Sequence, residues 1–129
     1  MKSSLSRQRQ ELWGLWRRMG RILKRLGVID PLTPGSLYWM GRKCGKANCA
    51  CARGKLHRTW VVTRSESGRA RLYTVRKESR AAVHRWTGAY RIYQRSRVRL
   101  VKRWAELLRR VDALAEARRV PWPGKDKRV

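Results

Sequence analysis

The sequence predicts an α+β fold, with a small zinc-stapled antiparallel β-sheet of about three strands between an N-terminal helix and a long C-terminal helix that pair as a helical hairpin. Apolar residues recur at helical spacing near both ends of the 129-residue chain, and alternating segments lie between them. All three cysteines fall within residues 44–51, where a metal ion would hold one end of the sheet. We expect a single domain over residues 1–119 and a flexible basic tail over residues 120–129.

Residues 5–26 are predicted to form a helix because their apolar positions alternate between spacings of three and four. Its apolar face comprises Leu5, Leu12, Leu15, Met19, Ile22 and Leu26. Ser3, Ser4 or Ser6 is expected to cap the start of this helix, and Gly27 to close its end in a left-handed conformation.

Residues 36–75 are predicted to form the sheet. A first strand over 36–42 leads directly into the cysteines. Residues 58–64 and 70–75 read as a hairpin around a turn at 65–68, because polar and apolar residues alternate in it and a glycine ends the turn. The loop with the cysteines therefore joins the first two strands.

Residues 78–119 are predicted to form the long helix. Its apolar seam comprises Val83, Trp86, Tyr90, Tyr93, Leu100, Trp104, Leu107, Val111 and Leu114, interrupted at Arg97. About forty helical residues span roughly 60 Å, which is longer than a small sheet can cover. We expect this seam to pack against Leu12, Leu15, Met19 and Ile22 of the first helix, with a homodimer through the long helix as the alternative.

Cys44, Cys49, Cys51 and His57 form a candidate site for one structural Zn²⁺. Three thiolates and one imidazole complete a tetrahedral set and leave no open position for catalysis. The alternatives are three reduced thiols beside a surface histidine, or His84 in place of His57 as the fourth ligand. The odd cysteine count disfavours a disulfide framework, and an iron–sulfur cluster would require a fourth cysteine.

The metal motif also carries a family resemblance. Its residues are Gly35-Ser36-Leu37, Cys44-Gly45-Lys46, Cys49-Ala50-Cys51, Gly54 and His57. Over residues 35–110 the chain resembles a small bacterial family that has a CGKxxCxCxxGxxH motif, a strand pair and a long charged helix. Its members are typically encoded beside transposase or integrase genes of mobile elements, which implies a recombinase or transposase as partner. Members usually continue after the histidine with a Gly-Pro-Tyr-like run, whereas this chain has Arg58-Thr59-Trp60.

The charge indicates a polyanionic partner. Lys and Arg number 34 against 8 Asp and Glu, giving a formal net charge of +26. Phosphate contacts from such residues supply most of the affinity of basic proteins for nucleic acids. No apolar run is long enough to span a bilayer, so we expect no membrane partner and a cytoplasmic location, with association with the nucleoid as one form of it.

Two basic surfaces are predicted to hold nucleic acid. A stripe on the long helix comprises Arg91, Arg95, Arg99 and Lys102, and a cluster around the metal loop comprises Arg42, Lys43, Lys46, Arg53, Lys55 and Arg58. The stripe lies in a segment without acidic residues, whereas an ordinary solvated helix face mixes both signs. Tyr38, Trp39 and Trp60 beside the loop are candidates for base stacking, with core packing as the alternative.

The sequence does not favour an enzyme, because its acidic residues are scattered singly and His84 stands alone. We expect a zinc-containing nucleic-acid-binding protein that acts as an accessory factor in a mobile element's recombination, transposition or guide-RNA machinery. The alternatives are a structural subunit or docking adaptor of a larger complex, and an RNA chaperone or ribosome-associated factor. Nothing in the sequence separates DNA from structured RNA as the ligand.

Overall fold

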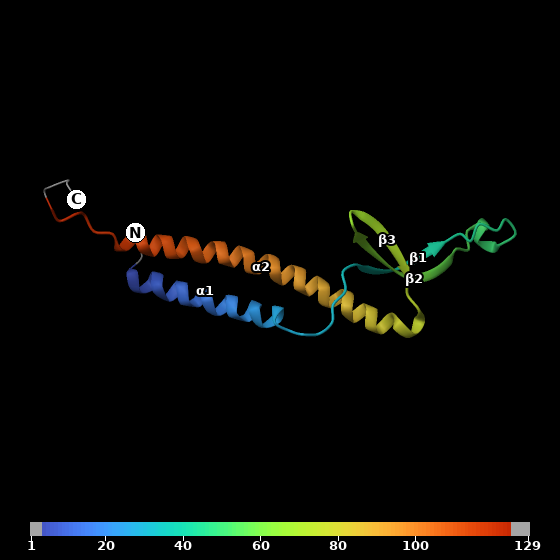
Figure 1. The fold of residues 1–129 in the computed structure, drawn as a ribbon, viewed down its shortest axis with the longest axis horizontal. Coiled ribbons are helices and arrows are strands. Elements are labelled where there is room, and N and C mark those ends of the chain that lie inside the picture. The colour runs from blue at the N-terminus through green and yellow to red at the C-terminus, as the bar shows by residue number, and fades with distance from the viewer. Residues whose placement is uncertain (1–3, 125–129) are drawn as a thin grey trace. The chain divides into compact units, whose positions relative to one another are not determined.

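The computed structural model describes residues 4–124, so residues 125–129 of the predicted tail lie outside the described residues (Figure 1). Two helices and three strands follow the predicted order and confirm the predicted fold class. They are α1 (Leu5–Leu26), β1 (Ser36–Arg42), β2 (His57–Glu66), β3 (Arg69–Thr74) and α2 (Arg80–Arg118), with short 3-10 turns η1 (Ala50–Arg53) and η2 (Lys77–Ser79). Within residues 4–124, neither helix combines the length and apolar character needed to cross a lipid bilayer.

The chain divides into two compact units. The first unit consists of two segments, the N-terminal one through Val28 and the one from Arg95 onward. The second unit is Ile29–Gln94. The first unit therefore contains α1 and most of α2, and the second contains the sheet, the metal loop and the start of α2. That the two units fold as one domain stays a prediction.

Helix α1 has the predicted bounds. The Ser4 side chain caps it by accepting a hydrogen bond from the backbone N–H of Arg7 at 3.2 Å. The prediction for its end was wrong, because Gly27 has φ −80° and is not left-handed. Instead, the Gly27 N–H donates to the Leu23 carbonyl, so the last turn closes as ordinary helix without the left-handed glycine cap.

In the first unit, α1 and α2 run side by side and antiparallel (Figure 1). Leu15 and Met19 are each only 1% exposed, and Leu12 and Ile22 are half-buried. These four residues form the inner face of α1, as predicted from their spacing. Two buried aliphatic side chains of this size contribute about 1.5–3 kcal/mol each to folding.

The seam of α2 in this unit differs from the prediction. Trp104 and Val111 are 52% and 42% exposed, whereas the neighbouring Arg103 is half-buried and Ser96 is buried. Ser96 and Arg103 lie on one three–four series of positions, and Trp104 and Val111 lie on another. Periodicity alone therefore did not show which series faces inward. The inner line comprises Ser96, Leu100, Arg103, Leu107 and Leu114. Arg103 is accommodated because its apolar stem can cover the helix interface while its guanidinium pairs with Glu106 at 2.9 Å.

In the second unit, the start of α2 also deviates from the predicted seam. Thr87 is fully buried, whereas Trp86 and Tyr93 are partly exposed. The Thr87 hydroxyl is satisfied within the helix by donating to the carbonyl of Val83 at 2.9 Å. A small side chain with an internal hydrogen bond can therefore occupy the buried position without a polar penalty.

The strands form one antiparallel sheet in the order β1-β2-β3, with Trp39 directly opposite Trp60. Val61 and Val62 are both buried, although consecutive strand residues point to opposite faces. Both faces of the central strand are therefore covered at this point. Gly35, which precedes β1 with φ +127°, lies so close to Val62 that an added Cβ would come within 2.8 Å of its side chain.

The hairpin between β2 and β3 is tighter than predicted. The strands continue to Glu66 and restart at Arg69, so only Ser67 and Gly68 form the turn, both with positive φ. Positive φ at both central positions is typical of the two-residue hairpin turn that matches strand twist. Glu66 stabilises this end of the hairpin by accepting hydrogen bonds from the Tyr73 hydroxyl at 2.8 and 2.9 Å and by pairing with Arg64 and Arg71.

Candidate metal centre and cationic surfaces

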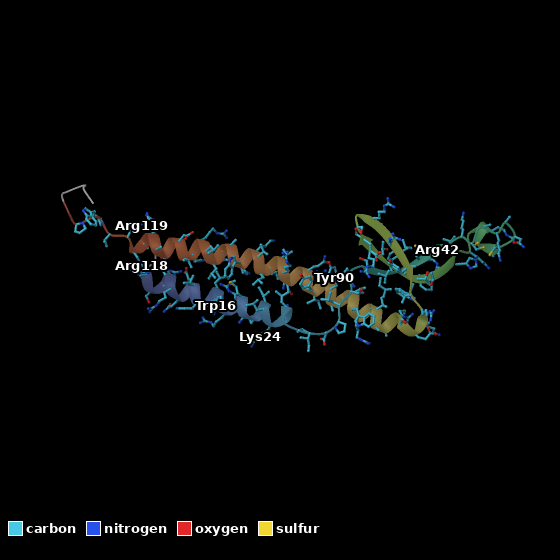
Figure 2. The ribbon with its side chains drawn as sticks, viewed as in Figure 1. Trp16, Lys24, Arg42, Tyr90, Arg118 and Arg119 are labelled. Carbon is cyan, nitrogen blue, oxygen red and sulfur yellow. The ribbon has the colours of Figure 1, made fainter. Side chains whose placement is uncertain are left out.

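The metal loop runs from the end of β1 to the start of β2. Arg42 (Figure 2) is the last residue of β1 and is opposite His57, the first residue of β2, so the loop closes between two paired strands. Cys44 lies just after β1, Cys49 precedes η1, and Cys51 lies within it. The sheet thereby brings together the two ends of the loop that carry the outermost ligands.

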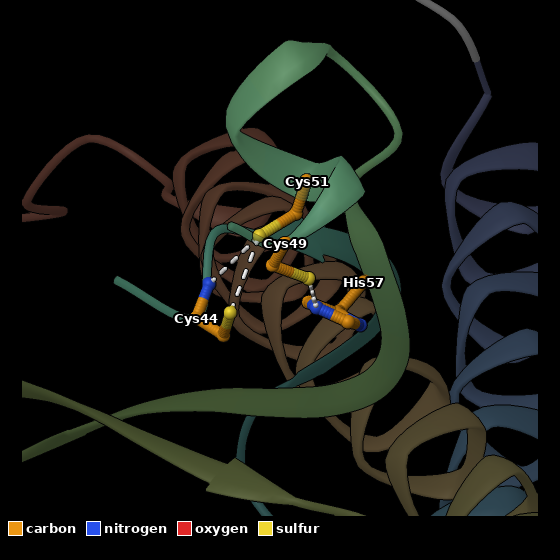
Figure 3. Close-up of side chains that lie close together, drawn as sticks. All are labelled: Cys44, Cys49, Cys51 and His57. Atoms are coloured by element: carbon orange, nitrogen blue, oxygen red, sulfur yellow. Dashed lines mark hydrogen bonds between the residues drawn. The ribbon is translucent and has the colours of Figure 1, made fainter. Parts of the chain in front are cut away.

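The four predicted ligands converge on one point (Figure 3). Their ligand atoms all lie within 4.8 Å of one another. The Cys44 and Cys51 sulfurs are 3.4 Å apart, and the Cys49 sulfur is 3.2 Å from Nε2 of His57. A tetrahedral zinc site with bonds of about 2.0–2.3 Å has edges of roughly 3.3–3.8 Å. The cluster can therefore hold a metal ion such as zinc after only small movements of the side chains.

The local electrostatics favour the metal-binding form of the Cys49 thiol. The backbone N–H of Cys51, followed by the hydrogen bond with His57, lowers the pKa of the Cys49 thiol. A second backbone donor, the N–H of Cys44, lies 3.3 Å from the Cys51 sulfur. Metals bind the thiolate, so the lowered pKa of Cys49 suits a metal ligand. The sulfur of Cys51 belongs to a buried residue, whereas Cys44 and His57 are exposed at the rim.

Two glycines, Gly45 and Gly54, shape the loop. Gly45 and Gly54 have φ of +82° and +104°, a region that other residues rarely adopt. An added Cβ at either position would meet nothing within 4 Å, so backbone conformation and not space requires glycine here. The N–H of Gly54 donates to the carbonyl of Cys51 at 3.3 Å, which closes η1 around a ligand.

His84 is not part of the cluster. It lies on α2, where with Leu37 and Trp60 it lines a hollow of about 500 Å³. Among residues 4–124, the cysteine-containing cluster of potential metal ligands consists of Cys44, Cys49, Cys51 and His57. His57 is therefore its only histidine. The geometry therefore favours the histidine that follows the cysteines over the alternative on the helix.

The predicted basic residues of the loop are all exposed. They are Arg42, Lys43, Lys46, Arg53, Lys55 and Arg58. No acidic residue occurs in the sequence between Asp30 and Glu66, so the loop carries unmixed positive charge. A bound metal would fix the backbone between these side chains.

The three predicted stacking residues separate onto two faces of the sheet. Trp39 and Trp60 lie on one face with ring centroids 5.4 Å apart, and the guanidinium of Arg80 lies 5.4 Å from the Trp60 ring. Tyr38, one residue from Trp39, points to the other face, where its hydroxyl contacts the sulfur of Met40 at 3.8 Å. Trp39 is about half exposed and offers an open ring, whereas Trp60 is partly enclosed.

A cationic groove lies between α1 and α2 in the first unit. It has a volume of about 540 Å³ and is lined by Ile22 and by six basic residues, namely Arg18, Arg21, Arg25, Arg99, Lys102 and Arg103. Two of these, Arg99 and Lys102, belong to the stripe predicted on the long helix. Arg95 and Arg91 are exposed on the same helix but do not line the groove, and Arg91 belongs to the other unit.

Sequence reasoning missed the contribution of α1 to this groove. Arg18, Arg21 and Arg25 recur at spacings of three and four, which already placed them on one helical face. Their meeting with the basic side of α2 depends on how the helices pair. Glu106 lies close by, where the hydrogen bond from Arg103 is the main cause that lowers the pKa of its carboxyl.

The fold and the cluster define a class of small α+β proteins with a candidate metal site lined by cysteine and histidine and with a strongly basic helical extension. The chain belongs to a family described as a domain of unknown function, DUF6788, whose sequence pattern matches residues 4–85. That match includes α1, the sheet and all four candidate ligands, and it ends within the first turns of α2. No curated protein and no solved structure matches the chain.

Proposed function

We propose that the protein binds nucleic acid and that one structural Zn²⁺ organises part of its binding surface. The observation that supports this most strongly is the groove lined by six basic residues, because a row of phosphates is the common biological ligand with matching repeated charge. The formal charge of +26 agrees with this interpretation. Such contacts hold the backbone and read little sequence, so binding is expected to be tolerant of base sequence.

The metal loop supplies a second contact surface in this proposal. With its four protein ligands filled, zinc has no open coordination position and serves to hold the loop in one shape. Lys46 and Arg53, between and after the ligand cysteines, are then presented from a fixed backbone. Binding, not catalysis, is the proposed activity, and the engagement of Glu11, Glu66 and Glu106 in ion pairs with arginines supports it.

Within this proposal, the protein is an accessory factor of a mobile element's recombination, transposition or guide-RNA machinery. The support for that role is the resemblance carried by the metal motif, whose family is typically encoded beside recombinase genes. A second candidate function is that of a docking subunit of a larger complex. The observation that favours it is the exposure of large apolar side chains on both helices, including Trp13, Trp16 and Trp104.

The test is a salt titration of binding to a fluorescent duplex and to a structured RNA. We expect the triple variant Arg21→Gln, Arg99→Gln, Lys102→Gln to bind more weakly and to have a shallower salt slope, by about one for each phosphate that is no longer neutralised. The control removes the same charge from exposed positions outside the groove: Arg17→Gln, Lys24→Gln and Arg69→Gln. Equally weakened binding in both variants would show that general charge, and not the groove, holds the ligand.

A further inference from the structure

The helical hairpin of the first unit has an exposed apolar face. On α1 it comprises Leu5, Trp13, Trp16 and Leu23, and on α2 it comprises Val101, Trp104, Leu108 and Val111. These eight side chains are between 42% and 57% exposed. Scattered apolar residues on a surface require no explanation, but these eight share one side of the hairpin, where Arg9 and Arg97 lie among them.

The two groups of residues lie on the same side of the hairpin. On α1, Trp16 lies about 80° to one side of the inner line through Leu15 and Met19, and Arg18 lies about 80° to the other side. On α2, Leu108 lies about 100° to one side of Leu107 and Arg99 about 80° to the other. The groove brings the basic sides of the two helices together. Their apolar sides must therefore meet on the opposite side.

The register of the helices places tryptophans at the centre of this face. Arg110 of α2 bonds to Glu11 of α1, so the antiparallel helices are level at these residues. Five residues further along α1, Trp16 is level with Ala105, the neighbour of Trp104, and in the same way Trp13 is level with Leu108. Leu5 and Leu114 line one hollow of about 390 Å³, in agreement with this register. Central tryptophans surrounded by smaller apolar residues are typical of the energetic centre of an interface.

The size of the face matches one half of a protein–protein interface. At these exposures the eight side chains leave roughly 800 Å² in contact with water, taking about 250 Å² for a whole tryptophan and less for leucine and valine. Monomers rarely expose contiguous apolar patches above a few hundred Å². A stable interface buries about 800 Å² on each partner.

We propose that a second copy of this chain covers the face, so that two hairpins form a four-helix bundle. The distribution of charge favours a second copy: Arg9 and Arg97 share the side of the apolar face, whereas the six basic residues that line the groove are on the opposite side of each hairpin. Two strongly basic chains can therefore associate without bringing the grooves together. An acidic partner would be drawn to the groove and not to this face. A two-fold pairing would also bring the Trp16–Trp104 region of each copy to the centre of the interface.

This inference does not depend on nucleic-acid binding, and the test is carried out with nucleic acid removed from the protein. Nuclease-treated, zinc-loaded protein at high salt is measured by sedimentation equilibrium. We expect the wild type to have twice the 15.2 kDa mass of one chain. Trp104→Glu should raise the dimer dissociation constant at least about 100-fold, because it buries a charge at the interface centre. A monomeric wild type at about 100 μM, or a dimer unaffected by Trp104→Glu, would overturn the proposal.

The matched control is Ile92→Glu, which makes the same change at a 56% exposed position of α2 that does not belong to the face. This variant should remain a dimer, and its dissociation would contradict the assigned face. If Trp104→Glu reduced the helical circular dichroism, Trp16→Gln on the other helix would decide the question with a milder change. Its dissociation with helicity intact supports the proposal, and its retention as a wild-type dimer overturns it.

Discussion

The guanidinium of Arg110 on α2 donates a hydrogen bond to the carboxylate of Glu11 on α1. Glu11 also pairs with Arg7 of its own helix at 3.2 Å, and Glu106 pairs with Arg103. These two carboxylates are embedded in a strongly basic hairpin. Both carboxylates offset repulsion among arginines, and the bond of Glu11 to Arg110 crosses between the helices, so it fixes the register that the apolar residues alone leave open.

We expect Glu11→Gln to destabilise the protein by about 0.5–1 kcal/mol, since partly exposed ion pairs contribute little individually. Urea denaturation at low and high salt measures this, and the difference from wild type should shrink as salt screens the charges. Glu116→Gln is the control, because that carboxylate is 69% exposed and pairs with Arg119, the residue just after α2. An equally large destabilisation by Glu116→Gln would remove the special role of the bond between helices.

The second prediction concerns acid stability. The hydrogen bond from Arg103 lowers the pKa of Glu106 below its unfolded value. A lowered folded pKa means that this stabilisation is present above the unfolded pKa and is lost as the pH falls through the folded pKa. Glu106→Gln should therefore be less stable than wild type near pH 7, and the gap should close in strong acid. Urea unfolding of both proteins across pH tests this, and a gap independent of pH would contradict it.

The third prediction is that the protein purifies with about one zinc per chain and that Cys49→Ser loses it. The serine hydroxyl is a poor substitute for a thiolate, and the loop between β1 and β2 should lose its fixed shape. Elemental analysis and thermal unfolding with and without a chelator measure both effects. His84→Ala is the control and should keep its metal. Loss of zinc from His84→Ala with retention in a His57→Ala variant would assign the fourth ligand to the helix.

The metal site shows what could be predicted from sequence. The cysteine spacing, the two glycines and His57 identify the ligands because all of them lie on one short loop, where local geometry decides which atoms can meet. The bounds of α1 (Leu5–Leu26) were likewise predictable from the spacing of its apolar residues, although three serines stayed open as its cap, and the strand β1 has the predicted bounds. Trp104 and Arg103 show the limit. Helix α2 is apolar on two sides, and periodicity cannot show which side meets α1.

The groove was only partly predictable, because one of its two sides can be seen on a single helix and the other cannot. The stripe through Arg99 and Lys102 is visible on one helix, but its completion by Arg21 depends on antiparallel pairing and register. Likewise, the alternation of strand residues already separated Tyr38 from Trp39. Only the structure shows that Arg80 covers Trp60 and leaves Trp39 as the more open ring.

The last prediction distinguishes single-stranded from duplex ligands. Trp39 presents a half-exposed ring beside Arg58, Lys77 and Arg80, with which it lines a hollow of about 250 Å³. An unpaired base can stack on this ring while the basic side chains hold its phosphate, whereas a base inside a duplex cannot reach it.

Stacking contributes about 1–3 kcal/mol per base, so Trp39→Ala should weaken binding of single-stranded RNA by roughly 5- to 150-fold. Duplex binding should be nearly unchanged. Tyr38→Ala is the matched control, because Tyr38 is an exposed aromatic residue on the adjacent position and the opposite face. Fluorescence anisotropy at fixed salt, with single strand and duplex of the same sequence, measures the six affinities of the wild type and the two variants. If Trp39→Ala and Tyr38→Ala weakened the binding of both ligands equally, the Trp39 ring would stabilise the sheet and would not contact the ligand. The binding affinity would then come from the basic surfaces alone.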